Sequence, residues 1–493
     1  MKLNRSFWGY NLYTLLWWCL APILWLGMAW RARRGDRDWH ILSAQRFGRY
    51  NQPWDGQEPV WLHAVSVGEV RAAAPLLRAL IDRGERVLLT HMTPTGGDEV
   101  RRMWQAEINA GLILQRWVPY DFLGSMQGLV QHYRPHLTIL IEREVWPNLI
   151  RASRLAGIPV VLASARFSEK SLKQAQRLDR LSLGLMRETY ATLDLVMAQT
   201  EDDAQRLKLM GTPHVQVTGN LKFDVQLPPL AIQEGIDWRE KFKRPLIVIA
   251  STREGEDAPF IAAIQAHALK IATQINLLNQ AVQANQTRPD SESLNADANP
   301  NTNLDANPRI PSPLYVIIPR HPQRFDSAAQ QLSTAKLQFG RWSVLKESIQ
   351  TKSVIALSTL ESIDVLLGDT MGEMPFFYAA AHVAIVCGSF EPHGGQNFIE
   401  ACAAGAATLV GPHTENFAQA VDSAQVAGAI KQVSNANDAI EYAHYLLNDE
   451  AVRQRYCAAA QIWLHEHVGA TQAMIKDMAE LEGQRAIQSV ALH

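Results

Sequence analysis

The sequence is poor in cysteine and in net charge, and each scarcity argues against a class of protein. Its 493 residues include four cysteines, none of them in a CxxC pair. This argues against a disulfide framework or a cysteine-based zinc site and is typical of reduced, buried thiols in a cytoplasmic body. The formal net charge is −2, so the composition gives no reason to expect a nucleic acid as partner.

Charged residues are absent from Ser6 to Trp30, where the chain reads FWGYNLYTLLWWCLAPILWLGMAW. As a helix this run would be about 36 Å long, enough for a bilayer core of about 30 Å. Because the positive charge that follows exceeds the charge that precedes it, the positive-inside rule leaves the rest of the chain in the cytoplasm. We expect residues 1–40 to be a single-pass membrane anchor with a basic flank. A helix lying in the interface or docked on the protein is the alternative. The flanking basic residues are Arg31, Arg33, Arg34 and Arg37, against Lys2 and Arg5 before the run.

Beyond this segment, short apolar runs alternate with amphipathic stretches, as in buried parallel strands that are each followed by a helix. We expect two Rossmann-like, doubly wound α/β domains at 41–225 and 243–430, followed by helices over 431–493. Residues 226–242, with a proline pair and weak periodicity, read as a linker. An Asn-, Asp- and Pro-rich segment at 275–312 predicts a disordered insertion. The expected strands are PVWLHAV, RVLLT, LTILIE, PVVLASA and LDLVMAQ, then RPLIVIAS, LYVIIPR, IDVLLGD, VAIVCGS and ATLVGP.

Polar residues gather where strands of the second domain end, which is where doubly wound sheets bind ligands. Gly394 and Gly395 would let backbone approach a ligand, and a helix starting near Asn397 would offer N–H groups to a phosphate. Glu400 lies one turn further on, suited to the ribose hydroxyls. A glycine-rich turn with a helix-capping acid is the alternative for this segment.

Two further strand ends carry candidate ligand contacts. Arg320 and His321 follow LYVIIP, and an Arg there can grip a phosphate with two hydrogen bonds. Met371, Gly372 and Glu373 precede a helix and could hold a base or a ribose. Each alone could be solvated surface, but three such loops in one domain predict a nucleotide site.

The first domain offers carboxylates at its own strand ends. Glu69 stands at a strand-to-helix turn, where a helix cap is its ordinary role. Glu142 and Glu144 follow LTIL, and at a spacing of two they would point the same way from an extended strand. Like charges that close require a cation or donor between them, and Lys222 is a candidate. No Asp-x-Asp motif follows an expected strand, so we expect no essential divalent metal.

Taken together, these motifs resemble the lipid A 3-deoxy-D-manno-octulosonic acid (Kdo) transferases, inner-membrane glycosyltransferases of the GT-B architecture. The resemblance covers nearly the whole chain apart from the insertion. Three positions differ from the usual family residue: Arg143 replaces Thr, Ser164 replaces Asn and Arg253 replaces His. The matching pieces are HAVSVGE, EREVWPNLI, SARFSEKS, GNLKFD, STREGE, PRHPQRF, GDTMGEM and GSFEPHGGQNFIEA with GPHTENF.

The resemblance implies two Rossmann-like domains facing a cleft and transfer of Kdo from CMP-Kdo to the lipid A precursor, lipid IVA, with inversion and release of CMP. It implies that Glu69 is the base, that Glu144 and Lys222 stabilise the transition state, and that Glu142 assists them. No cofactor is expected. The implied contacts to CMP are Pro319, Arg320, His321, Met371, Gly372, Glu373, Asn397, Phe398, Ile399 and Glu400.

Two other functions remain open from the sequence. One is a membrane-tethered GT-B transferase or epimerase that uses UDP- or GDP-sugars. The other is a non-catalytic protein that binds nucleotide or lipid on the same frame. The sequence leaves undetermined the number of Kdo units added, the oligomeric state and the role of the insertion.

Overall fold

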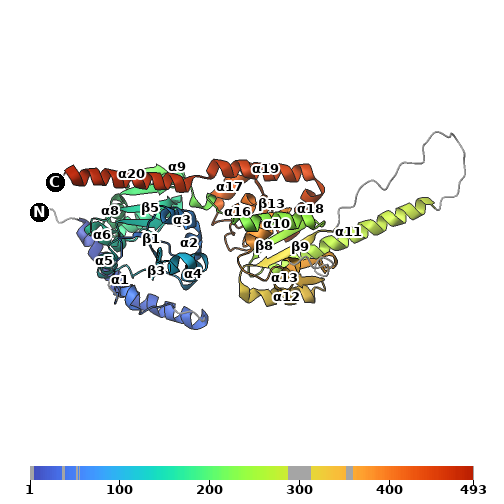
Figure 1. Ribbon diagram of the computed structural model, residues 1–493, viewed down its shortest axis with the longest axis horizontal. Coiled ribbons are helices and arrows are strands. Elements are labelled where there is room, and N and C mark those ends of the chain that lie inside the picture. The colour runs from blue at the N-terminus through green and yellow to red at the C-terminus, as the bar shows by residue number, and fades with distance from the viewer. Residues whose placement is uncertain are drawn as a thin grey trace. The chain divides into compact units, whose positions relative to one another are not determined.

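The computed structural model describes residues 5–35, 39–51, 54, 56–286, 312–350 and 359–491, which fall into two compact units. Unit 1 comprises Met1–Val225 and His467–His493, and unit 2 comprises Gln226–Glu466. In each, a seven-stranded sheet lies between layers of helices (Figure 1). All pairings among the described strands are parallel.

The sheet of unit 1 has the order β3-β2-β1-β4-β5-β6-β7. Leu62 of β1 lies opposite Leu89 of β2 and Ile139 of β4. The strands are β1 (Val60–His63), β2 (Val87–His91), β3 (Ile113–Trp117), β4 (Leu137–Ile141), β5 (Val160–Ala165), β6 (Leu195–Ala198) and β7 (Val215–Val217). The helices are α1 (Arg5–Gly35), η1 (Ala44–Phe47), α2 (Val67–Ala72), α3 (Ala74–Asp82), α4 (Pro94–Asn109), α5 (Leu123–Tyr133), α6 (Pro147–Leu155), α7 (Glu169–Leu181), α8 (Leu185–Ala191), α9 (Glu201–Leu209), η2 (Leu221–Phe223) and α20 (Ala470–Ala491).

The sheet of unit 2 has the order β10-β11-β9-β8-β12-β13-β14. Ile249 of β8 lies opposite Ile317 of β9 and Ile385 of β12. The strands are β8 (Leu246–Thr252), β9 (Leu314–Pro319), β10 (Phe339–Arg341), β11 (Val365–Leu367), β12 (Val383–Val386), β13 (Ala407–Val410) and β14 (Ile430–Gln432). The helices are α10 (Pro229–Lys241), α11 (Asp257–Gln286), η3 (Pro322–Arg324), α12 (Phe325–Thr334), α13 (Trp342–Gln350), α15 (Met374–Ala380), α16 (Ile399–Ala403), α17 (Ala418–Val426), α18 (Ala436–Asn448) and α19 (Glu450–His467).

All ten strands expected from apolar runs are confirmed. They are buried on both faces, as crossover helices require of a parallel sheet. The strands missed are β3, β7, β10 and β14, which are shorter or more polar and stand at or next to the sheet edges.

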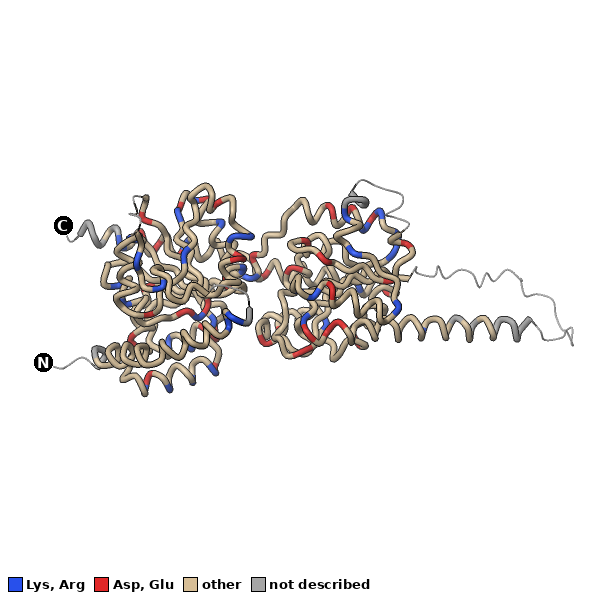
Figure 2. The backbone as a smooth tube through the Cα atoms, turned by 90° about the horizontal axis from the view of Figure 1, so that it is seen from below, with Lys and Arg blue, Asp and Glu red and all other residues tan. Residues whose placement is uncertain are grey.

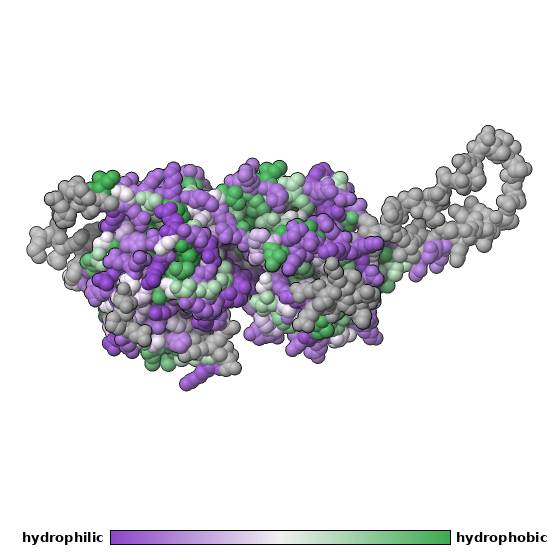
Figure 3. Space-filling view, viewed as in Figure 1, coloured by the Kyte–Doolittle hydropathy of each residue, from purple (hydrophilic) through white to green (hydrophobic). Residues whose placement is uncertain are grey.

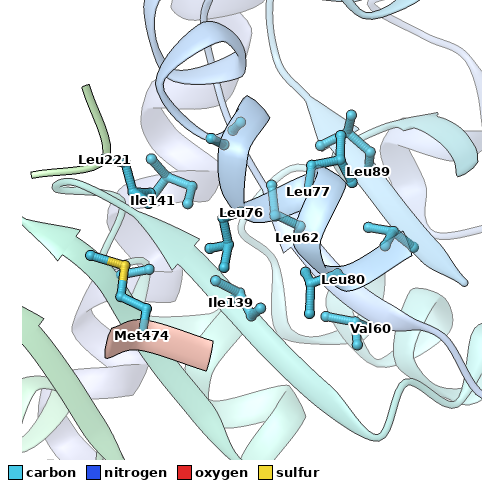
Figure 4. Close-up of a cluster of buried hydrophobic side chains, with 14 of the residues drawn as sticks. Val60, Leu62, Leu76, Leu77, Leu80, Leu89, Ile139, Ile141, Leu221 and Met474 are labelled. Atoms are coloured by element: carbon cyan, nitrogen blue, oxygen red, sulfur yellow. The ribbon is translucent and has the colours of Figure 1, made fainter. Parts of the chain in front are cut away.

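The core of unit 1 shows how strand residues of period two meet helix residues of period 3.6. Val60 and Leu62 of β1 point to one face of the sheet, where they pack against Leu76, Leu77 and Leu80 of α3 (Figure 4). Trp61, between them, belongs to the core on the opposite face. The alternation places helices on both faces and leaves the strand ends as the accessible edge.

The C-terminal helix α20 belongs to unit 1, although the chain enters it from unit 2. Met474 packs in the same core as Leu221 of η2 (Figure 4). Asp224 accepts hydrogen bonds from the backbone N–H groups of Gly469, at 2.7 Å, and Thr471. These bonds satisfy N–H groups at the start of the helix and fix it to the segment that carries Lys222.

Three sequence expectations about organisation are wrong. The linker at 226–242 contains α10, which packs on α15; a Cβ on Gly235 would lie 2.3 Å from the carbonyl oxygen of Phe376, so glycine permits this close approach. Residues 275–286 of the expected insertion continue α11, because helix formers persist there and proline comes later. Only 287–311 of that segment lie outside the described residues. The boundary at 430 also cuts β14.

Helix α1 is the one described helix that is long and apolar enough to cross a membrane, over Trp8–Arg33. No Asp, Glu, Lys or Arg lies between Arg5 and Arg31, so this part of the tube in Figure 2 is tan. In the structure α1 does not stand apart from unit 1. Ala21 is buried in a cluster with Tyr120 and Phe122, two residues of the body.

Candidate functional site

The order of strands in unit 1 reverses direction between β1 and β4. Ligands of doubly wound sheets bind at such a switch point, outside the carboxyl ends of the strands. Glu69 follows β1, whereas Glu142 and Glu144 follow β4. Three carboxylates that the sequence singled out are therefore held by the two loops that flank the switch point.

Glu69 sits in the first turn of α2 and turns back toward the start of its helix. Its Oε2 accepts hydrogen bonds from the backbone N–H groups of Val65 (2.6 Å) and Ser66 (3.0 Å). Burial and the charges of Glu144 and Glu142 raise the pKa of Glu69 from 4.5 to about 7, and the two N–H groups oppose the rise. The same side chain caps a helix and has the proton affinity of a general base at neutral pH.

Glu142 pairs with Lys222, but not in the way that the sequence predicts. The two side chains are largely buried, and Lys222 Nζ lies 2.7 Å from Glu142 Oε1. The expected extended conformation is wrong, because β4 ends at Ile141 and Glu142 has φ = 57°, in the left-handed region. The rule that residues two apart in a strand point the same way therefore does not apply to these two carboxylates.

Glu144 has a donor of its own. Trp146 Nε1 donates a hydrogen bond of 2.7 Å to Glu144 Oε2. Burial raises the pKa of Glu144, with the Trp146 hydrogen bond and Arg143 opposing and Glu142 adding to the rise. Lys222, the cation expected to lie between the two acids, thus pairs with Glu142. Glu144 instead accepts a hydrogen bond from the indole of Trp146.

His63 is a part of this site that the sequence analysis missed. It is buried at the end of β1, where its Nδ1 lies 2.9 Å from Thr90 Oγ1. Its ring meets the indole of Trp146 edge to face, with centroids 5.0 Å apart. Burial lowers the pKa of His63 to about 3, so the ring is neutral and supports the residue that orients Glu144.

In unit 2 the switch point lies between β8 and β12, and a buried acid missed by the sequence analysis joins the two strand ends. Glu256 accepts three backbone N–H hydrogen bonds, from Arg253 (2.7 Å), Gly388 (2.8 Å) and Phe390 (2.9 Å). These bonds hold the loop after β12 to the segment that follows β8. The STREGE motif contains this residue and Arg253, but the other two partners are 132 and 134 residues away.

Glu400, which the sequence analysis predicted to bind the ribose, lies beside Asn397. Asn397 Nδ2 donates a hydrogen bond of 2.9 Å to Glu400 Oε1. The expected helix begins at Ile399 and has five residues. Arg320, which follows β9, donates from Nε to Gln396 Oε1 at 3.3 Å. The loops after β9 and β12 therefore converge, as the proposed nucleotide site requires.

The remaining predicted contacts differ in what their side chains can reach. Phe398 and Ile399 are buried, and Phe398 stacks on Trp463 with centroids 5.7 Å apart. Ligand contacts from these two residues would thus come from the backbone. Pro319 ends β9 opposite Thr252, and His321 is exposed just after it.

The segment after β11 is held by the carboxylate of Glu373. Trp342 Nε1 donates to it at 2.7 Å, and Lys346 and Thr370 also contact it. Met371 is exposed and Gly372 has φ = 87°. The Glu373 side chain is thus engaged within unit 2, and its expected contact with the nucleotide stays a prediction.

The two glycines of the HGGQN motif have a conformational reason as well. Gly394 and Gly395 have φ of 85° and 83°, which side-chain-bearing residues rarely adopt. A Cβ on Gly394 would lie 2.5 Å from Asn416 Nδ2. The loop needs glycine for its own packing whether or not a ligand approaches.

Comparison with known proteins identifies both parts of the chain. Residues 43–225 match the family described as 3-Deoxy-D-manno-octulosonic-acid transferase (kdotransferase), and residues 350–463 match Glycosyl transferases group 1. A 3-deoxy-D-manno-octulosonic acid transferase from Bordetella pertussis is 44% identical over 477 residues, which cover 96% of this chain and 100% of that protein.

Two solved structures share the fold. UDP-GlcNAc 2-epimerase from Neisseria meningitidis, bound to UDP-GlcNAc, has a TM-score of 0.51 at 15% identity, covering 86% of this chain and 100% of its own. A glycosyltransferase from Rickettsia africae has a TM-score of 0.50 at 12% identity, covering 87% and 99%. At this identity the likeness shows the fold alone, which is GT-B-like.

The raised pKa of Glu69 predicts how its neighbour controls it. In Glu144→Gln a like charge is lost, so the pKa of Glu69 should fall from about 7 toward 4.5. The carboxylate would then form at lower pH than in the wild type. A pH titration of ¹³C-labelled glutamate carboxyls by NMR measures this, with the Glu69 signal assigned by its loss in Glu69→Gln. Glu58→Gln, an exposed control, should leave the titration unchanged. An unshifted Glu69 in Glu144→Gln would contradict the electrostatic account.

The three hydrogen bonds of Glu256 predict a local effect in unit 2. A hydrogen bond to a charged group contributes about 1.5–3 kcal/mol, so Glu256→Ala should speed amide hydrogen exchange at Gly388 and Phe390 by about tenfold or more. Glu256→Gln, which keeps one acceptor oxygen, should give a smaller increase. The control Glu254→Gln changes an exposed acid two residues away and should have no effect. Equal exchange in all variants would rule out the role given to Glu256.

Proposed function

The chain belongs to the 3-deoxy-D-manno-octulosonic acid (Kdo) transferase family, and we propose that it transfers Kdo from CMP-Kdo to the lipid A precursor lipid IVA, in the assembly of the lipopolysaccharide core. The observation that carries this proposal is the raised pKa of Glu69, about 7. Glu69 follows one of the two strands at the switch point of unit 1, and Glu142, which pairs with Lys222, and Glu144 follow the other. A binding protein needs no carboxylate of that proton affinity; a transferase does.

In the proposed reaction Glu69 is the general base. A sugar hydroxyl of the acceptor gives its proton to the Glu69 carboxylate while its oxygen bonds to the anomeric carbon of Kdo. The bond from that carbon to the phosphate oxygen breaks, and CMP leaves with the electron pair. Attack opposite to the leaving group inverts the anomeric centre.

Lys222 and Glu144 are proposed to stabilise the transition state. The Glu142–Lys222 pair keeps the ammonium group at 2.7 Å from one carboxylate, which fixes a positive charge next to the switch point. Glu144, oriented by Trp146, keeps the Glu69 proton affinity high. Both effects act before the substrate arrives and so cost no reorganisation during the reaction.

Unit 2 is proposed to bind the CMP part of the donor. Glu400, held by Asn397, would accept hydrogen bonds from the ribose hydroxyls, and Arg320 would meet the phosphate. The remaining proposed contacts hold the cytosine base and the ribose of CMP. They come from Pro319, His321, the backbone of Phe398–Ile399 and the loop at 371–373.

Helix α1 is proposed to hold the chain on the cytoplasmic side of the bacterial inner membrane, where the glycolipid acceptor lies. Arg31 and Arg33, exposed at the end of the apolar run, would favour an anionic surface by about 1 kcal/mol per charge.

Glu69→Gln tests the proposal. The amide can still accept the hydrogen bonds of Val65 and Ser66, so the helix keeps its cap, but it takes up no proton. Turnover of CMP-Kdo with lipid IVA should fall by a factor of about 10² or more, while CMP still raises the melting temperature and UDP, the control nucleotide, does not.

The control for that experiment is Glu58→Gln, which should keep wild-type turnover. Mass spectrometry of the product identifies the sugar and counts the units transferred. Turnover of Glu69→Gln within a few-fold of the wild type would exclude Glu69 as the base, and protection by UDP rather than CMP would favour a different donor.

We further expect transfer to need no divalent metal, because Arg320 would supply positive charge to the phosphate of the donor. Enzyme dialysed against EDTA and assayed in excess EDTA should keep its rate. A rate that is lost and returns only with added Mg²⁺ or Mn²⁺ would contradict this expectation.

A further inference from the structure

One face of α1 packs on the body of unit 1 along most of its length. Tyr10, Trp17, Ala21, Trp25 and Met28 recur at spacings of three, four and seven residues, so they share one side of the helix. Tyr10 and Ala21 are buried, and the rest of the stripe is partly buried. The partners are aromatic residues of the body: Trp17 contacts Phe122, and Trp25 contacts Phe47 and Tyr120.

Polar contacts make this packing specific. Tyr13 donates a hydrogen bond of 2.7 Å from its hydroxyl to Asp121 Oδ2. Asp121 also accepts from the backbone N–H groups of Asn148 (3.1 Å) and Leu149 (2.8 Å), in the first turn of α6. The guanidinium of Arg151 lies 4.4 Å from the ring centroid of Tyr10. Nonspecific packing of an apolar helix would not pair Tyr13 with Asp121 or Tyr10 with Arg151.

Gly9 allows the N-terminal part of α1 to approach the segment around Ser182 and Leu185 closely. A Cβ on Gly9 would lie 2.7 Å from the carbonyl oxygen of Ser182 and 3.2 Å from Leu185 Cβ. The packed stretch from Gly9 to Met28 is thus about 28 Å long at 1.5 Å per residue.

The opposite face of α1 is apolar and largely exposed. Its central stripe consists of Trp8, Leu15, Cys19, Leu26 and Trp30, spaced by seven and four residues. Trp8 is 53% exposed, Leu26 72% and Trp30 55%. By contrast, the protein surface seen in Figure 3 is mostly hydrophilic. An apolar strip of this length, bordered by tryptophans, fits the lipid–water boundary.

Packing on the body and crossing the bilayer exclude each other. The packed stretch is about as long as the hydrocarbon core is thick. A crossing helix would have to give up the Tyr13–Asp121 bond and the aromatic contacts, or draw Asp121 and Arg151 into hydrocarbon, where charged groups are very unfavourable.

We propose that α1 lies in the plane of the cytoplasmic membrane surface, with its Trp8–Trp30 stripe in an anionic phospholipid bilayer and its other face on unit 1, rather than crossing the membrane. This replaces the single-pass topology expected from the sequence. It rests on the proposed membrane attachment but is independent of the transfer chemistry.

The arrangement has a consequence for the candidate site. Asp121, which holds Tyr13 of α1, also holds the first turn of α6, two residues after Trp146, the partner of Glu144. Thus α1 and the loop of acidic residues after β4 share one anchor point. A membrane that lies along α1 would bring lipid head groups beside the edge of the sheet that carries Glu69.

The test is the depth of three positions of the outward stripe. The full-length protein carries Cys457→Ser, because the other two cysteines of the body are buried. One variant is labelled with a fluorophore at native Cys19. Two others carry Cys19→Ser and are labelled at Trp8→Cys or at Trp30→Cys. It is bound to vesicles of phosphatidylethanolamine and phosphatidylglycerol, and nitroxide lipids report depth by quenching. We expect the three positions to lie at one shallow depth. A crossing helix would instead put Cys19 near the midplane, about 16 Å from each end position, and that result would overturn the proposal.

A second measurement does not depend on vesicles. In mild detergent, Ala21→Cys in a Cys19→Ser background should react with a thiol reagent at least tenfold more slowly than native Cys19, because Ala21 is 1% exposed. Equal rates would show that α1 is not packed on unit 1 and would also overturn the proposal.

The outcomes separate this inference from the proposed function. Failure of the protein to float with vesicles would refute the attachment itself. Transfer from CMP-Kdo to detergent-dispersed lipid IVA, measured on the same variants, reports on the chemistry alone.

Discussion

Carboxylates bound by backbone N–H groups organise the edge of each sheet. In unit 1, Glu69 accepts the N–H groups of Val65 and Ser66; in unit 2, Glu256 accepts those of Arg253, Gly388 and Phe390. A parallel sheet ends in loops whose N–H groups have lost their strand partners, and a carboxylate can satisfy two or three of them at once. The two acids thereby hold the loop after β1, which leads to Glu69 itself, and the loop after β12, which leads to Asn397 and Glu400.

The two acids nevertheless do different things, because their surroundings differ. Glu69 faces the charges of Glu144 and Glu142, and its pKa rises to about 7 in spite of its two donors. Its hydrogen bonds fix its place, and the neighbouring charges make it basic. Glu256 has three donors from two strand ends and is 1% exposed, so its role is to hold the loop that leads to Asn397 and Glu400. One kind of interaction thus holds a carboxylate of raised pKa in unit 1 and a loop framework in unit 2.

A third carboxylate of this kind links the candidate site to α1. Asp121 satisfies N–H groups at the start of α6 and also receives the hydroxyl of Tyr13. The loop before α6 carries Glu144 and Trp146. If the proposed function and the proposed membrane position of α1 hold, one buried acid helps to place both the helix that would meet lipid and the loop that carries Glu144.

The sequence by itself determined the two parallel sheets, because strands buried on both faces must be continuously apolar. It also located Glu69, Glu142 and Glu144, because strand ends can be read from those runs. It also identified α1 as apolar. It could not show the turn at Glu142, the role of Glu256 or the support from His63, because these depend on partners far away in the chain. Nor could it show that α20 returns to unit 1 or that α1 packs through Tyr13, since a periodic pattern gives the face of a helix but not the surface it meets. Those choices are made by hydrogen bonds and packing that exist only once the chain has folded.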